Sequence, residues 1–152
     1  MYARILVPID GSACSDEGAK EAVALAKGLG SAVVFLFVMD TLRTRREGVV
    51  NMSEALEALT AQGQVLLDDA RRVAAGAGVR SAGELVEGTP VDAIVRRSAD
   101  FDLVVMGSHG RGIFRRLTVG SVTQAVMQRI ALPMLIVRCD ADGGRITKHP
   151  AR

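Results

Sequence analysis

Five short apolar segments alternate along the chain with segments of helical periodicity, and this alternation limits the possible folds most. The apolar segments are residues 5–9, 32–38, 84–87, 103–106 and 134–137. Short, nearly continuous apolar runs are typical of strands buried in a parallel sheet; only residues 84–87 alternate with polar residues, as expected near an edge. Strand and helix alternate four times before a final strand. The order predicts a single α/β domain with a five-stranded parallel sheet and helices on both faces.

Turn and capping residues set the limits of the predicted helices. Ser12 or Ser15 can cap the first helix, and Gly28 and Gly30 can end it. Capping patterns place the other helices at residues 51–76, 89–98 and 120–130, the first of them beginning at Asn51. We expect residues 40–50, which are polar and basic, to form a loop. The domain is expected to span residues 1–139, with a flexible C-terminal tail at residues 140–152.

Composition excludes several classes of protein. Aromatic residues make up 3% of the chain, Trp is absent and the net charge is only +2, which is unlike a nucleic-acid-binding protein. No apolar run approaches the roughly 20 residues needed to cross a bilayer. The N-terminus has no signal-peptide layout, so we expect a cytoplasmic location without membrane attachment. Cys14 and Cys139 form no metal-ligand pattern, and we expect them to be buried free thiols.

A glycine-rich segment follows the fourth predicted strand and indicates phosphate binding. Gly107 and Gly110 allow the backbone to approach a ligand closely, and Gly120 begins a helix whose free N–H groups favour anions. The hydroxyls of Ser121 and Thr123 lie in the first turn of that helix. Glycine-rich turns also occur for structural reasons, so spacing alone leaves both interpretations open. The segment matches neither the P-loop nor the dinucleotide fingerprint.

Unusual residues also end two other strands, and parallel sheets bind ligands at the carboxyl ends of their strands. Asp10 ends the first strand and Asp40 follows the second. Asp10 can contact a nucleotide, cap a helix or act in catalysis, while Asp40 can contact ribose or metal or simply begin a solvated loop. Two basic clusters are either solvated loops or arms beside a polyanionic ligand; they are Arg43, Arg45 and Arg46, and Arg111, Arg115 and Arg116.

Four sequence motifs together resemble the universal stress protein family. They are Val7-Pro8-Ile9-Asp10-Gly11-Ser12, then Gly88-Thr89-Pro90 with Ile94, then the Gly-x2-Gly-x9-Gly-Ser run from Gly107 to Ser121, and the ending Pro133-Met134-Leu135-Ile136-Val137. The glycine run is similar to that of the ATP-binding branch of the family. The resemblance covers residues 2–138 and implies a Rossmann-like, adenine nucleotide alpha hydrolase-like fold with strand order 3-2-1-4-5.

The resemblance also implies a ligand, its binding residues and an assembly. The ligand is ATP, with Mg²⁺ or Mn²⁺ as a possible companion ion; AMP and cyclic AMP remain open as the physiological nucleotide. Members of the family commonly form homodimers through the last strand, here residues 134–137. The residues expected at the nucleotide are Pro8, Ile9, Asp10, Val38, Met106, Gly107, His109, Gly110, Arg111, Gly120, Ser121, Val122 and Thr123.

The function that follows is an ATP-dependent regulatory switch in stress response, read by an unidentified protein partner. No nucleophile and base pair is evident, and His109 is better explained as a turn residue than as a catalytic group. Two alternatives remain open. One is a slow ATPase or a phosphoryl or nucleotidyl transferase, and the other is a dimerisation module that binds no nucleotide.

Overall fold

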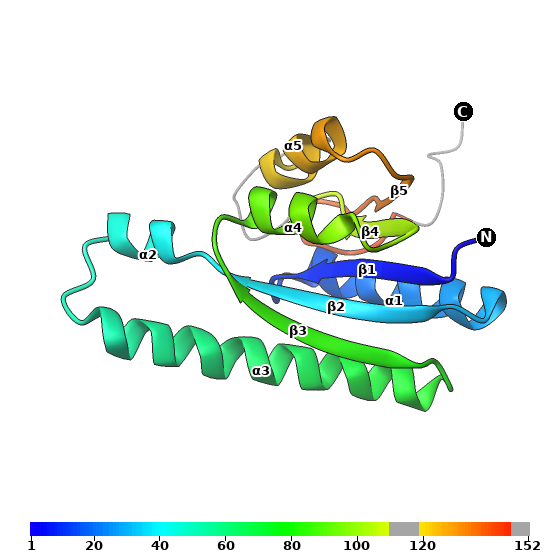
Figure 1. The fold of residues 1–152 in the computed structure, drawn as a ribbon, viewed down its shortest axis with the longest axis horizontal. Helices are drawn as coiled ribbons and strands as arrows, with labels where there is room; N and C mark the ends of the chain where they lie inside the picture. Colours follow the sequence, from blue (N-terminus) through cyan, green and yellow to red (C-terminus); the bar gives the residue numbers. More distant parts are fainter. Residues whose placement is uncertain (110–118, 147–152) are drawn as a thin grey trace.

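The central strand of the sheet is β1 (Arg4–Ile9), which pairs in parallel with β2 (Ala32–Met39) and β4 (Leu103–Gly107). The sheet ends at β3 (Ser81–Glu87) beside β2 and at β5 (Met134–Val137) beside β4 (Figure 1). The computed structural model describes residues 1–109 and 119–146. Its strand order β3-β2-β1-β4-β5 confirms the predicted fold.

Two helix layers cover the two faces of the sheet, as the alternation of β1 requires. Ile5 and Val7 of β1 belong to the core beneath α1 (Ala13–Leu29) and α3 (Met52–Gly76). Leu6, which points to the other face, packs in the core beneath α4 (Pro90–Ser98) and α5 (Ser121–Arg129). Within the described ranges, no helix is both long enough and apolar enough to cross a membrane.

The segment predicted as a loop at residues 40–50 contains a short helix, α2 (Thr41–Arg46), so that prediction was wrong. Two local interactions form the helix. The Asp40 carboxylate accepts a hydrogen bond from the Arg43 backbone N–H at 3.0 Å, and the Arg43 guanidinium pairs with Glu47 at 2.9 Å, one helical turn later. The sequence analysis interpreted the polar, basic composition as a loop and did not consider the aspartate cap or the i,i+4 ion pair.

Cys14 and Cys139 form a disulfide, which corrects the expectation of free thiols. The two residues are 125 positions apart in sequence, but the fold brings their Cα atoms to 5.8 Å. Cys14 is in the first turn of α1 and Cys139 follows β5. Residues 140–146 then turn back on the chain through a bridge between Cys139 and Arg145, and Arg145 pairs with Glu21 of α1. The rest of the expected tail, residues 147–152, lies outside the described part.

Close backbone packing joins α1 to the end of β4. A Cβ atom at Gly18 would lie 2.9 Å from the Gly107 nitrogen, and a Cβ atom at Gly107 would lie 2.5 Å from the Cys14 carbonyl oxygen. Carbon atoms do not approach other atoms this closely without a shift. The structure thus gives Gly107 a packing role that the sequence analysis did not anticipate.

An ion pair holds the edge strand β3 to α4. The Arg97 guanidinium donates to both carboxylate oxygens of Glu84, at 2.6 and 2.7 Å. This hydrogen bonding lowers the pKa of the Glu84 carboxyl below its ordinary value, and partial burial offsets the shift only in part. Arg97 also lies 4.9 Å from the centre of the Phe101 ring. The charged pair therefore closes the apolar core beneath α4 at its rim.

Candidate functional site

A cavity of about 300 Å³ opens at the carboxyl ends of β1, β2 and β4. The order of the strands reverses at β1, which makes this the usual ligand-binding crevice of an open α/β sheet. Its volume lies at the lower end of the roughly 300–1,000 Å³ that is typical of small-molecule sites. The cavity brings together every predicted site residue that the structure describes, namely Pro8, Ile9, Asp10, Val38, Met106, Gly107, His109, Gly120, Ser121, Val122 and Thr123.

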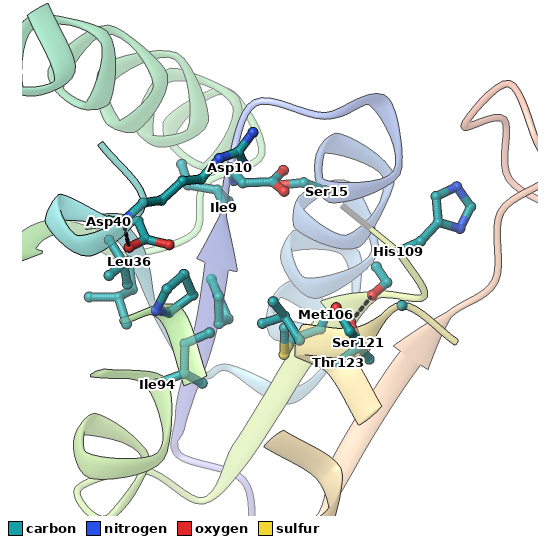
Figure 2. Close-up of a pocket in the computed structure, with 17 residues that line it drawn as sticks. Ile9, Asp10, Ser15, Leu36, Asp40, Ile94, Met106, His109, Ser121 and Thr123 are labelled. Carbon is teal, nitrogen blue, oxygen red and sulfur yellow. Dashed lines mark hydrogen bonds between the residues drawn. The ribbon is translucent and has the colours of Figure 1, made fainter. Parts of the chain in front are cut away.

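One end of the cavity is mainly apolar. Leu36 and Val38 alternate along β2 and therefore point to the same face of the sheet, and Ile94 faces them from α4. Figure 2 shows Leu36 and Ile94 on the side of the cavity away from Ser121 and Thr123. Flat apolar ligand groups are bound by side chains of this kind.

The other end is formed by the junction of β4 and α5. The Thr123 hydroxyl donates to the Gly107 carbonyl at 3.0 Å, and the Gly120 N–H donates to the Ser108 carbonyl at 2.6 Å. These bonds point the start of α5 into the cavity. Gly120 is the N-cap, and because it has no side chain it makes no capping hydrogen bond to the first turn of α5. Uncapped N–H groups at a helix N-terminus favour a bound anion.

Asp10 lies between the two ends and is held by the start of α1. Its backbone N–H donates to the Ser15 hydroxyl at 3.1 Å, and its carboxylate accepts from the Ser12 N–H at 2.9 Å. Ser12 is the N-cap of α1. A carboxylate held by one N–H can still accept hydrogen bonds from ligand hydroxyls. The neighbouring Asp16 carboxyl has a raised pKa, mainly because of burial and in part because of the charge on Asp10.

Six cavity residues lie outside the predicted set, and two of them, Asp40 and Arg43, are charged. Arg43 of α2 lines the cavity together with Asp40, while Arg45 and Arg46 are exposed residues outside it. The sequence shows these arginines as one basic cluster, and only the position of α2 in the fold shows that Arg43 alone of the three lines the cavity. The remaining four are Ser15, Leu36, Pro90 and Ile94.

Other predicted features are placed less fully. Gly110 and Arg111 lie outside the described residues. His109 lines the cavity, but its ring points away from the other labelled side chains (Figure 2), and its Nδ1 atom is 3.2 Å from the Ser108 hydroxyl. Within residues 1–109 and 119–146, no three His, Cys, Asp or Glu side chains cluster in a way that could hold a metal ion.

Comparison with known proteins identifies the family. The sequence profile of the Universal stress protein family matches residues 1–138. The chain belongs to this family. A universal stress protein of Methanocaldococcus jannaschii, MJ0531, is 32% identical over 143 residues, which cover 91% of this chain and 83% of the relative.

Solved structures of family members have the same fold. The structure of MJ0577, also from Methanocaldococcus jannaschii, is 27% identical, covers 91% of this chain and 96% of its own, and aligns with a TM-score of 0.78. A universal stress protein solved in complex with cAMP is 26% identical, covers 90% of this chain and 97% of its own, and aligns with a TM-score of 0.68. That relative therefore binds an adenine nucleotide.

Proposed function

We propose that this universal stress protein binds an adenine nucleotide, ATP in the first instance, and acts as a nucleotide-dependent switch in the stress response. The observation that carries the proposal is one cavity with an apolar end, a central carboxylate and an uncapped helix N-terminus. These three features suit the base, the sugar and the phosphates of a nucleotide in that order. The cAMP-bound relative supports the same class of ligand.

Each part of the nucleotide has a matching group. The base fits between Leu36 and Val38 on β2 and Ile94 on α4, and the Asp10 carboxylate can accept hydrogen bonds from ribose hydroxyls. The phosphates fit at the first turn of α5, beside Ser121. A companion Mg²⁺ would be held chiefly by the phosphates and water, because Mg²⁺ commonly takes only one or two protein carboxylates. Asp10 and Asp40 are the two carboxylates that line the cavity.

The direct test is calorimetric titration with ATP, AMP, cyclic AMP and adenosine, with GTP as the control. We expect ATP to bind and GTP to bind at least tenfold more weakly. Equal heats for ATP and GTP, or none for either, would reject the proposal. Hydrolysis of excess ATP with Mg²⁺ or Mn²⁺, measured in parallel, distinguishes a switch from a slow ATPase or transferase.

Arg43 is expected to lie against the base, because it lines the cavity at the β2 end, near Asp40. A guanidinium over an aromatic ring contributes about 1 kcal/mol at an exposed site, which corresponds to roughly a fivefold change in Kd. The Arg43→Ala variant should therefore weaken the binding of ATP and of adenosine by the same factor of about five, as measured by calorimetry. Arg45→Ala removes the same charge from α2 outside the cavity and should change neither affinity. A loss for ATP alone would instead place Arg43 at the phosphates.

The proposal includes a homodimer formed through the edge strand β5. The Val104 N–H donates to the Pro133 carbonyl and the Ser108 N–H donates to the Val137 carbonyl. The backbone N–H and C=O groups of the odd-numbered residues in β5 therefore face β4. The N–H of Ile136 then faces outward, where a second strand can pair with it. We expect the wild type to sediment as a dimer and Ile136→Pro as a folded monomer, because the lost N–H is not used within the sheet. A monomeric wild type would contradict this assembly.

A further inference from the structure

The disulfide lies directly behind the phosphate end of the cavity. Cys14 is in the first turn of α1, and its carbonyl and sulfur would lie 2.5 and 2.9 Å from a Cβ atom at Gly107, which lines the cavity. Cys139 joins β5 to the turn at residues 140–146. The bond therefore connects two elements that enclose the end of β4. It plays no part in the nucleotide contacts proposed above.

Ser108 connects the disulfide to the start of α5. Its hydroxyl accepts from the Cys139 N–H at 3.2 Å and is 3.7 Å from the Cys14 sulfur. Its N–H donates to Val137, and its carbonyl accepts from Gly120, the N-cap of α5. Ser108 is only 6% exposed, so no solvent space takes up a shift of these partners. Ser108 therefore joins Cys139 to Gly120 through a continuous path of hydrogen bonds.

The surroundings of the two sulfurs suit the reduced state as well as the oxidised one. The Val137 carbonyl oxygen lies 3.8 Å from the Cys14 sulfur and 3.7 Å from the Cys139 sulfur, and the Cys14 carbonyl oxygen lies 3.9 Å from the Cys139 sulfur. In the disulfide neither sulfur has a proton to donate. After reduction, each new thiol proton has a carbonyl oxygen nearby that can accept it.

We propose that Cys14 and Cys139 form a reversible thiol–disulfide exchange site, and that its oxidised form holds Ser108 and the start of α5 in the phosphate-binding geometry. The reductant is a protein or small-molecule dithiol. Disulfides of proteins in reducing compartments are usually transient and redox-sensing, which fits the cytoplasmic location expected from the sequence. The effect on phosphate binding rests on the proposed nucleotide function, whereas the exchange itself does not.

The exchange proceeds in two displacements. A thiolate of the dithiol attacks the Cys139 sulfur, forms a mixed disulfide with it and releases Cys14 as a thiolate. The second thiol of the reductant, as the thiolate, then attacks the reductant sulfur that is bonded to Cys139. The reductant closes into a disulfide and the Cys139 thiolate is released. Both protein thiolates take up protons, so two electrons and two protons have moved and the dithiol has become a disulfide.

The fold favours this direction of attack. Cys139 is 8% exposed and Cys14 only 1%. The turn covering Cys139 is closed by its own backbone hydrogen bonds, but its side-chain ion pair to α1, between Arg145 and Glu21, is partly exposed and contributes little to stability. Local opening of that turn exposes Cys139 first. Cys14, in contrast, lies in the first turn of α1, where the helix dipole favours a leaving thiolate, and its sulfur is 3.7 Å from the Ser108 hydroxyl, which can donate to it.

Reduction should move Cys139 rather than Cys14. Non-bonded heavy atoms keep about 3.5–4 Å apart, nearly twice a bonded S–S distance. Cys14 is confined by the Gly107 backbone, so the Cys139 side must yield, and its N–H leaves the Ser108 hydroxyl. We expect reduction to weaken ATP binding about tenfold, which is the size of a typical coupling between sites, and to leave adenosine binding unchanged.

The test compares the full chain after treatment with oxidised glutathione and after dithiothreitol. Alkylation under denaturing conditions and intact mass spectrometry should count no thiols in the first state and two in the second. Calorimetry should then show the tenfold weaker ATP binding and unchanged adenosine binding of the reduced form. Cys139→Ser and Cys139→Ala, checked for folding by circular dichroism, should bind ATP weakly under both treatments.

Each outcome decides one part. Two thiols after the oxidising treatment would overturn the exchange site, and equal ATP affinities in the two states would overturn its link to the cavity. If ATP binds in neither state, the proposed nucleotide function fails, while the thiol count still decides the exchange. An equal loss for ATP and adenosine on reduction would also overturn the link, because it would show a general loosening rather than an effect at the phosphate end.

Discussion

Gly107→Ala is expected to lower the free energy of unfolding by about 3 kcal/mol, the upper part of the usual range for overpacking. The added methyl group would lie 2.5 Å from the Cys14 carbonyl oxygen and 2.8 Å from its carbonyl carbon. Both are backbone atoms of α1, so no flexible side chain can move aside. Either α1 must retreat from β4 or the end of β4 must shift into the cavity. ATP binding should be lost in the second case even where the protein remains folded.

Denaturant unfolding measures this change, and a glycine elsewhere provides the control. Gly28 lies in α1, and nothing in the described part of the chain beyond the neighbouring helix backbone lies within 4 Å of a Cβ atom added there. Gly28→Ala should raise the free energy of unfolding by roughly 0.5–1 kcal/mol, because alanine loses less conformational entropy in a helix. If the two variants had similar stabilities, the close contact between α1 and β4 would be absent in solution.

The contrast between these two glycines illustrates what sequence reasoning can and cannot resolve. Gly107 was assigned to ligand approach because it lies in a glycine-rich run, and the structure shows that its missing side chain makes room for Cys14. The two explanations are compatible, since Gly107 also lines the cavity. A one-dimensional pattern identifies a position that must be small, but the neighbour that requires it is distant in sequence.

Local signals explain why most of the fold was predictable. Apolar period, together with caps that act within three residues, predicts the limits of most strands and long helices; one such cap is Asn51, whose side chain accepts from the Glu54 N–H. The strand β3 differs, because it begins at Ser81 rather than at residue 84 and its first three residues carry no apolar run. Another exception, α2, depends on an aspartate cap and one ion pair within a basic segment. Its register decides that Arg43 rather than Arg45 reaches the cavity, and no sequence period carried that information.

Long-range pairing explains what was missed. Cys14 and Cys139 meet only because β4 and β5 bring the end of the chain beside the start of α1. Two cysteines 125 residues apart give no sign of this on their own. Strand order, once known, places both at the carboxyl edge of the sheet. The pairing of the two cysteines could then have been considered, because β1, which leads into Cys14, and β5, which leads into Cys139, are the two neighbours of β4.

Ser121→Asp is expected to weaken ATP binding by about 2 kcal/mol, roughly 30-fold, and to leave adenosine binding unchanged. Ser121 is the first residue of α5, is exposed and lines the cavity. A carboxylate there repels phosphate oxygens and itself occupies the uncapped N–H groups. The same charge is favourable for the helix dipole, so the fold should be retained or slightly stabilised. Loss of binding would not result from unfolding.

Two matched variants separate charge from position in that experiment. Ser121→Asn keeps nearly the size of the aspartate without its charge and should cost much less ATP affinity. Ser53→Asp places the same charge on an exposed residue in the first turn of α3, outside the cavity, and should have no effect. Calorimetry of all three with ATP, AMP and adenosine should show a loss for Ser121→Asp that grows with the number of phosphates. An equal loss for adenosine would mean that the nucleoside, rather than the phosphates, lies at α5, which would reverse the proposed orientation.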